Sequence, residues 1–154
     1  IGAAIAKAFA EAGADIVLAA RTLEPLEETA AAVRAFGRRA LIVQTDVMDE
    51  DQLQNLADQA LAEFGRIDIL VNNAGGFPPK PALQTSGRDF EKAFKFNVAS
   101  AFNLTRICVP LMVETAGGGA CLSTCSFSLQ ANSKRLAEHI RLYLLSCLNE
   151  DFAK

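Results

Sequence analysis

Residues 69–76, ILVNNAGG, begin as an apolar run and end in two amides and two glycines. The run has the length and composition of a buried strand. In a parallel sheet covered by helices, ligands bind outside the carboxyl ends of the strands. At such an end, glycines let the main chain approach a flat ring closely, and asparagine amides tie neighbouring strands together. The stretch is therefore typical of a wall against a nucleotide, although an ordinary turn would use the same residues.

Apolar runs of strand length alternate with helical patterns along the rest of the chain. Strands are predicted at residues 15–20, 40–46, 66–73 and 117–126. Helices, with apolar side chains at helical spacing, are predicted at residues 2–12, 23–36, 49–65 and 89–116. Strands separated by helices of about ten or more residues imply right-handed crossovers and a parallel sheet covered on both faces. The sequence therefore predicts an α/β fold with a doubly wound parallel sheet.

The two ends of the chain depart from this pattern. Ile1 and Gly2 lead straight into the first helix with no strand before it, so the sheet is expected to be incomplete. Residues 133–148, SKRLAEHIRLYLLSCL, carry an apolar stripe at helical spacing and are predicted to form an amphipathic helix. Residues 1–154, with 51% hydrophobic content, are expected to form one domain, as an internal piece of a longer protein.

Composition excludes two classes of partner. The 15 basic and 18 acidic residues give a net charge of −3 and no basic face for a nucleic acid backbone. Charged residues interrupt the apolar stretches before the roughly 18 residues that span a bilayer, and no signal sequence is recognised. We therefore expect no nucleic acid partner, no membrane span and a cytoplasmic location.

The cysteines are predicted to be buried, reduced thiols, because the composition supplies a core without disulfides. They are Cys108, Cys121, Cys125 and Cys147. Cys121 and Cys125 are spaced as a metal pair could be, but this pair and a single His are too few ligands for zinc. No metal site is predicted.

Charged residues follow the first two predicted strands. The guanidinium of Arg21 could hold a phosphate, or it could be a solvated arginine at a helix entrance. Ala20 offers no carboxylate to a ribose diol, which favours NADP over NAD. Asp46 could accept a hydrogen bond from an adenine amine, or it could cap the next helix.

Several of these residues occur together in the order and approximate spacing of a known family. They are Ile1 and Gly2, NNAG at residues 72–75, Asn97 within FNVAS, and Ser126 at a strand end. From Ile1 to about Ser126 the chain resembles the short-chain dehydrogenase/reductase family. RIDILVNNAGG with PKP following is similar to bacterial members that act on hydroxysteroids and on 3-oxoacyl substrates.

The resemblance implies a Rossmann-like fold that binds NADP, with NAD as the less favoured cofactor. Gly2 would lie under the pyrophosphate at a helix N-terminus, where amides and the helix dipole favour anions. The implied cofactor-binding residues are Gly2, Arg21 at the 2′-phosphate, Asp46 and Val47 at the adenine, and Asn72, Asn73, Ala74 and Gly75 along the ribose and nicotinamide. The implied catalytic residues are Asn97, which would hold a water in a proton relay, and Ser126, which would hydrogen-bond the substrate carbonyl.

The proton donor that the resemblance implies is missing from its expected place. The family uses a tyrosine whose pKa is lowered by a lysine one helical turn later, in the motif YxxxK. Here the single Tyr143 is followed by Cys147 where the lysine belongs. His139, Lys134 and an unassisted Tyr143 are open substitutes, and none is assigned. The resemblance stops after Ser126, which a truncated fragment, a shifted reading frame or a divergent ending would each explain.

The resemblance implies an oxidoreductase that transfers hydride between NADP(H) and a small alcohol or ketone. Activity is expected to be impaired in this chain, because YxxxK is absent. The alternative is a non-catalytic nucleotide-binding or scaffold protein with the same fold. The helix at residues 89–115 is apolar on all sides, which suggests a homo-oligomer, although much of this surface could be core.

Overall fold

The computed structural model describes residues 1–76, 78, 80–123 and 142–146. Its helices are α1 (Gly2–Glu11), α2 (Leu23–Ala35), α3 (Glu50–Phe64), α4 (Gly87–Phe94) and α5 (Ser100–Ala116), with a 3₁₀ turn at Ala82–Gln84 and a π-helical turn at Lys95–Ala99. Its strands are β1 (Asp15–Ala20), β2 (Ala40–Gln44), β3 (Ile69–Asn72), β4 (Ala120–Ser123) and β5 (Leu142–Ser146). Up to β4, each predicted helix and strand is confirmed, with ends shifted by a few residues.

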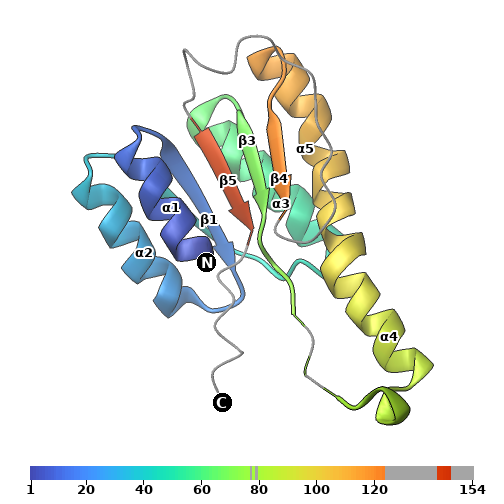
Figure 1. Cartoon of the computed structure of the whole chain (residues 1–154). Helices are drawn as coiled ribbons and strands as arrows, with labels where there is room; N and C mark the ends of the chain where they lie inside the picture. Colours follow the sequence, from blue (N-terminus) through green and yellow to red (C-terminus); the bar gives the residue numbers. More distant parts are fainter. Residues whose placement is uncertain (77, 79, 124–141, 147–154) are drawn as a thin grey trace.

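The strands form one parallel sheet in the order β2-β1-β5-β3-β4 (Figure 1). Their carboxyl ends are level. Ala20 pairs with Gln44 across β1 and β2, and Ser146 of β5 pairs with Ala19 on one side and Asn72 on the other. The arrowheads in Figure 1 point to this carboxyl edge, where the N-terminal end of α1 also lies. The predicted doubly wound parallel sheet is confirmed.

Helices cover both faces of the sheet, as Figure 1 shows. Side chains of a strand point alternately to opposite faces, so β1 contributes to two cores. Ile16 and Leu18 pack with α1 and α2, whereas Val17 packs with α3 and α5. The first core also contains Ala6, Ala10, Leu26, Ala30 and Val33. The second core also contains Leu53, Leu56, Leu70, Leu104 and Met112.

The two ends of α3 show how local sequence fixes an element. Asp49 is the N-cap, and its side chain accepts hydrogen bonds from the N–H groups of Asp51 at 3.0 Å and Gln52 at 3.2 Å. These bonds satisfy two donors that have no partner within the helix. Gly65 ends the helix with a φ of 75°. Glycine adopts this left-handed conformation without a steric penalty, which explains the sharp stop.

Residues 142–146 correct the sequence prediction. Their helical stripe predicted part of an amphipathic helix, but Leu142–Ser146 forms the central strand β5, between β1 and β3. An apolar segment such as LYLLS is typical of a central strand in a parallel sheet. Backbone groups along β1 and β3 gain hydrogen-bonded partners from this strand. Pairing with distant strands therefore overrides the local helical period. The rest of the predicted helix lies outside the described residues.

α4, the π-helical turn and α5 form one helix from Gly87 to Ala116, as predicted. α5 packs into the core, whereas α4 extends past the carboxyl edge of the sheet and has no buried residue (Figure 1). An 18-residue window of this helix has a mean hydropathy of 1.3, which is apolar enough to cross a membrane by length and composition alone. The expectation that charged residues keep every stretch of this length from being apolar enough is therefore wrong. Core contacts of Leu104, Cys108 and Met112 account for part of the apolar character.

Charged contacts tie the amino edge of the sheet, where the strands begin. The N–H of Arg39 donates to Oδ1 of Asp15 at 3.0 Å, its guanidinium donates to Oδ2 at 3.0 Å, and Arg38 lies 2.6 Å from Oδ1. Burial would raise the pKa of Asp15, but the hydrogen bonds from Arg39 and the two positive charges hold this pKa below its ordinary value of 3.8. Arg66 forms a similar ion pair with Asp68, just before β3.

Candidate functional site

The ends of β1 and β2 bring two predicted site residues to one edge. The N–H of Thr45 donates to the carbonyl of Ala20 at 2.9 Å, and Nε2 of Gln44 donates to the carbonyl of Arg21 at 2.7 Å. Arg21 is exposed directly after β1, and Asp46 follows the end of β2. The two residues therefore lie after adjacent strand ends, where a doubly wound sheet binds its ligands.

Asp46 forms a turn and does not cap a helix. Its Oδ1 accepts a hydrogen bond from the N–H of Met48 at 2.9 Å, and its own N–H donates to Oε1 of Gln52 at 2.8 Å. Because Asp49 is the N-cap of α3, the capping alternative for Asp46 is wrong. The side chain of Val47 is buried in the core with α3 and α5. A ligand at this edge would therefore meet the backbone of Val47 more readily than its side chain.

The NNAG segment combines buried amides with small residues. Nδ2 of Asn72 donates to Oγ1 of Thr105 on α5 at 3.1 Å and to Sγ of Cys121 on β4 at 3.6 Å. This amide ties β3 to a neighbouring strand and to the helix behind it, as expected. Asn73 and Ala74 are also buried, and Gly75 is partly exposed. The segment thus presents little side-chain bulk at the carboxyl edge.

Two of the predicted thiols lie behind this segment. Cys108 and Cys121 are free cysteines, as predicted, with Cys108 buried and Cys121 partly buried. Burial, together with the neighbouring Cys121, raises the pKa of Cys108 to about 12. Cys108 therefore stays protonated and unreactive near neutral pH. Cys125 and Cys147 lie outside the described residues. Within the described part of the chain, no group of three or more His, Cys, Asp or Glu could hold a metal ion.

Asn97 joins the segment after β3 to the long helix. Its Oδ1 accepts a hydrogen bond from the N–H of Gly76 at 2.7 Å, and its Nδ2 donates to the carbonyls of Gly76 at 3.0 Å and Ala93 at 2.7 Å. Asn97 lies in the π-helical turn, a local widening that is frequent at functional sites. Its side chain thus bonds three backbone groups, a role that the sequence did not reveal. The FNVAS motif marked the residue but not its partners.

One carboxylate fastens the loop that precedes α4. Oδ2 of Asp89 accepts hydrogen bonds from the N–H of Ser86 at 3.1 Å, from Oγ of Ser86 at 2.8 Å and from Nζ of Lys80 at 3.1 Å. Ser86 is the N-cap of α4, and its Oγ accepts from the N–H of Asp89 at 3.1 Å, which completes a capping box. Hydrogen bonds from Ser86 and Lys80 lower the pKa of Asp89 to about 2. Asp89 is therefore ionised at neutral pH.

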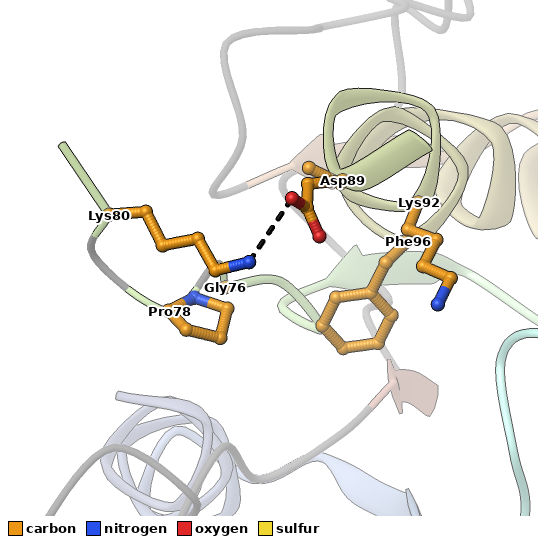
Figure 2. A pocket seen from close by; sticks show the side chains of 7 residues that line it. Gly76, Pro78, Lys80, Asp89, Lys92 and Phe96 are labelled. Carbon is orange, nitrogen blue, oxygen red and sulfur yellow. Dashed lines mark hydrogen bonds and ion pairs between the residues drawn. The ribbon is translucent and has the colours of Figure 1, made fainter. Parts of the chain in front are cut away.

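A hollow of about 250 Å³ opens between this loop and α4 (Figure 2). Its lining residues are Gly76, Pro78, Lys80, Asp89, Lys92, Ala93 and Phe96. Because Gly76 is hydrogen-bonded to Asn97 and directly follows Gly75, the hollow adjoins the NNAG segment. None of these lining residues was predicted as a site residue from the sequence. Their only signal was a loop rich in Gly and Pro after NNAG.

The N-terminal end of α1 lies at the same carboxyl edge (Figure 1). Gly2 is buried there, Ile1 provides no side-chain cap, and no acidic residue lies in the first turn. The first N–H groups of a helix have no partner within the helix. This end of α1 therefore favours an anion. The role of Gly2 under a pyrophosphate stays a prediction.

Of the two predicted catalytic residues, Asn97 is among the described residues and Ser126 lies outside them. The unassigned substitutes Lys134 and His139, and Cys147 at the place of the family's lysine, also lie outside them. In β5, Tyr143 pairs with Ile16 of β1 and Ile69 of β3. It lies three residues before Ser146, which pairs with Asn72 at the carboxyl end of β3. A strand rises about 3.3 Å per residue, so the backbone of Tyr143 lies about 10 Å from the carboxyl edge. This position argues against Tyr143 as a proton donor at that edge.

Comparison with known proteins identifies the family. Residues 1–137 match the family model for short chain dehydrogenases. An uncharacterized oxidoreductase of Mycobacterium tuberculosis is 48% identical over 126 residues, which are 82% of this chain and 48% of that protein. The 7α-hydroxysteroid dehydrogenase of Escherichia coli K12 is 36% identical over 149 residues, which cover 91% of this chain and 58% of that protein. The chain thus spans about half the length of the curated relatives that it matches.

Solved structures share the fold. A 7α-hydroxysteroid dehydrogenase complexed with NADH and 7-oxo glycochenodeoxycholic acid superposes with a TM-score of 0.72 at 34% identity, over 80% of this chain and 48% of that one. The L-sorbose reductase of Gluconobacter frateurii, complexed with NADPH and L-sorbose, gives 0.72 at 36% identity, over 78% of this chain and 46% of that one. Similar proteins therefore bind either cofactor. The family match and the parallel sheet together show that this chain belongs to the short-chain dehydrogenase/reductase family of oxidoreductases.

Proposed function

We propose that this chain is the NADP-binding part of a dehydrogenase/reductase that interconverts small alcohols and ketones. The observation that carries the proposal is the level carboxyl edge, at which Arg21, Asp46 and Asn73 follow the strand ends beside the N-terminus of α1. Ligands of doubly wound sheets bind at this edge. Residues 1–154 would form a single dinucleotide-binding domain in this scheme.

The groups at this edge fit a dinucleotide. The uncapped amides at Gly2 would hold the pyrophosphate, because the helix end offers N–H donors without a competing carboxylate. Asp46 would accept from the adenine, with the backbone of Val47 beside it. Ala74 and Gly75 would lie along the ribose and nicotinamide, where small residues allow close approach. The cofactor supplies or accepts the hydride, and these residues hold and orient it.

NADP is preferred over NAD in this proposal because of Arg21. Arg21 is exposed at the end of β1, and Ala20 before it offers no carboxylate to a ribose diol. A guanidinium can pair with a 2′-phosphate through two hydrogen bonds. We expect Arg21→Ala to weaken NADPH binding about tenfold and NADH binding little, measured by cofactor fluorescence titration. Arg34→Ala, which removes an exposed arginine from α2, is the matched control. Equal losses for both cofactors would contradict the assignment.

Catalysis is proposed to be impaired in these 154 residues. Tyr143 lacks a lysine four residues later, and its backbone pairs within the sheet. Ser126 would still hydrogen-bond the substrate carbonyl. Asn97 would act by holding Gly76 against the helix, which fixes the wall beside the nicotinamide. A proton donor at the developing alkoxide would be missing, and such a donor typically contributes about 10² to 10⁴-fold to the rate.

The same pairing of Tyr143 within β5 favours a second candidate function, nucleotide binding without catalysis. One experiment separates the candidates. We expect saturable NADPH binding by the purified chain and no detectable NADPH oxidation with a panel of ketones. Normal turnover would show that a proton donor is present and would contradict the impairment. Absence of NADPH binding would contradict both functions.

A homo-oligomer is proposed from the exposed apolar surface of the long helix. Large apolar side chains are exposed at Phe90, Phe94, Phe102 and Val113. Leu104, an apolar residue of the same helix, belongs to the core. Exposed aromatic residues along one helix are typical of an interface. A monomeric mass by light scattering at micromolar concentration would contradict the oligomer.

We further propose a cytoplasmic protein with a small carbonyl or alcohol substrate, no nucleic acid partner and no membrane partner. The acidic net charge of −3 supports the absence of a nucleic acid partner. The burial of Leu104, Cys108 and Met112 supports a core role for α5 instead of a membrane span.

A further inference from the structure

We propose that the hollow in Figure 2 binds a carboxylate, with Lys92 as its cation, and that the substrate is therefore an oxo acid or a hydroxy acid. The identity of this carboxylate as part of a substrate rests on the proposed function. The hollow itself lies outside the residues assigned to the cofactor.

The net charge of the lining residues favours a ligand with one negative charge. Two lysines and one aspartate line the hollow, which leaves one excess positive charge. Lys80 is paired with Asp89 at 3.1 Å, and Asp89 is also bonded to Ser86. The side-chain ammonium of Lys92 has no ion pair or hydrogen bond within the described part of the chain, although the backbone carbonyl of Lys92 accepts from Lys95. A ligand carboxylate beside Lys92 would neutralise the remaining charge.

The chemistry of the lining favours a carboxylate over a phosphate. A phosphate carries about −1.5 to −2 charges near neutral pH and would bring them close to the ionised Asp89. A carboxylate brings one charge, which matches the single excess cation. Lys92 also offers one ammonium, whereas phosphate sites typically combine several donors. A monoanion therefore balances the hollow better than a dianion.

The remaining lining favours an apolar segment next to the charge. Pro78, Ala93 and Phe96 line the hollow with apolar surface, and Figure 2 shows the ring of Phe96 beside the Lys92 side chain. A volume of about 250 Å³ accommodates the carboxylated end of a ligand.

Continuity with the NNAG segment connects the hollow to the reacting centre. Gly76 lines the hollow, and Gly75 before it belongs to the proposed wall along the nicotinamide. A ligand with its carbonyl carbon at that wall extends into the hollow past Gly76. The bonds from Asn97 to Gly76 fix this junction.

The test uses the whole chain and two probes of the same shape, benzoate and its neutral counterpart benzamide. Binding is followed by backbone NMR shifts at Gly76 and Ala93. We expect benzoate to bind more tightly than benzamide. Lys92→Gln should weaken benzoate binding about two- to fivefold, the range of a partly exposed ion pair, and leave benzamide binding unchanged. Lys92→Arg keeps the charge and should keep most of the affinity.

Lys95→Gln is the matched control, because it removes the same charge from the next turn without touching the hollow. Equal binding of the two probes, no effect of Lys92→Gln, or an equal effect of Lys95→Gln would overturn the carboxylate site. NADPH titration of the same samples separates the two proposals. If benzoate binds more tightly than benzamide but NADPH does not bind, the proposed function alone is overturned. If NADPH binds but benzoate and benzamide bind equally, the carboxylate site alone is overturned.

Discussion

The two edges of the sheet are built from different chemistry. At the amino edge, Asp15 and Asp68 form ion pairs with arginines, and Gly119 packs directly against the backbone before β3. At the carboxyl edge, amides and glycines follow β3. The helix α4, which extends past this edge, has no buried residue. Strong internal contacts at one edge hold the strands together. At the carboxyl edge, the segment after β3 instead adds little side-chain bulk and has few ion pairs among the contacts described.

This difference suggests that the amino edge mainly determines stability and the carboxyl edge mainly determines ligand binding. Changes at the amino edge should lower the free energy of unfolding without altering how the opposite edge meets a ligand. Changes at the carboxyl edge should alter ligand binding at a smaller cost in stability. The following predictions test this separation.

The largest effect is expected at Gly119. A Cβ at this position would meet the carbonyl of Asp68 and the side-chain end of Met112, and backbone atoms cannot move aside cheaply. We expect Gly119→Ala to lower the free energy of unfolding by about 3 kcal/mol or more, measured by urea denaturation. Gly87→Ala is the control, because a Cβ there meets no atom within 4 Å. Similar stabilities of the two variants would show that the amino edge is not tightly packed.

A smaller effect is expected when the charge of Asp15 is removed. Asp15→Asn loses the ion pairs with Arg38 and Arg39 and should cost about 2 kcal/mol at pH 7, as charge-assisted hydrogen bonds do. Because the folded pKa lies below 3.8, the stabilisation is present above that value and is lost as the pH falls through the folded pKa. Urea denaturation at decreasing pH should therefore show the wild type and the variant converging.

Asp58→Asn is the matched control for this charge, because Asp58 is exposed on α3 and its side chain bonds only Gln54 in the contacts described. It should leave stability nearly unchanged. A difference between wild type and Asp15→Asn that persists in acid would mean that the lost contacts are not those of the ionised carboxylate.

The smallest loss of stability is expected at Asn97, on the carboxyl edge. Asn97→Ala removes three hydrogen bonds to backbone groups of Gly76 and Ala93 and should cost about 1 kcal/mol. Hydrogen exchange at the N–H of Gly76 should become faster. The free energy of NADPH binding should change by more than the free energy of unfolding. Asn103→Ala, which removes an exposed bond to Glu50, is the control. Unchanged exchange at Gly76 would contradict the positioning role.

Local signals in the sequence predicted much of the fold. Asp49 begins α3 as its N-cap, and Gly65 ends it with a left-handed φ. Both features depend only on residues nearby in the chain. The alternation of apolar runs with helices likewise predicted the parallel sheet, and NNAG marked the carboxyl end of β3. These features depend on residues close together in the chain.

Features that depend on distant residues were missed. β5 was predicted as a helix, because its own periodicity is helical and the positions offered by β1 and β3 are not visible in its sequence. The partners of Asn97 depend on a π-helical turn, which no residue pattern in FNVAS announces. The hollow depends on a loop fastened to α4 by Lys80 and Asp89. In each case the missing information is a contact between segments.

The most direct test of the central claim is a map of backbone amide shifts on titration with NADPH. We expect saturable changes at Gly2, Arg21, Asp46, Asn73 and Gly75, all at the carboxyl edge, and little change at Asp15, Asp68 and Gly119. Saturable changes confined to the amino edge, or no saturable change at all, would contradict the claim that the carboxyl ends of the strands form the cofactor site.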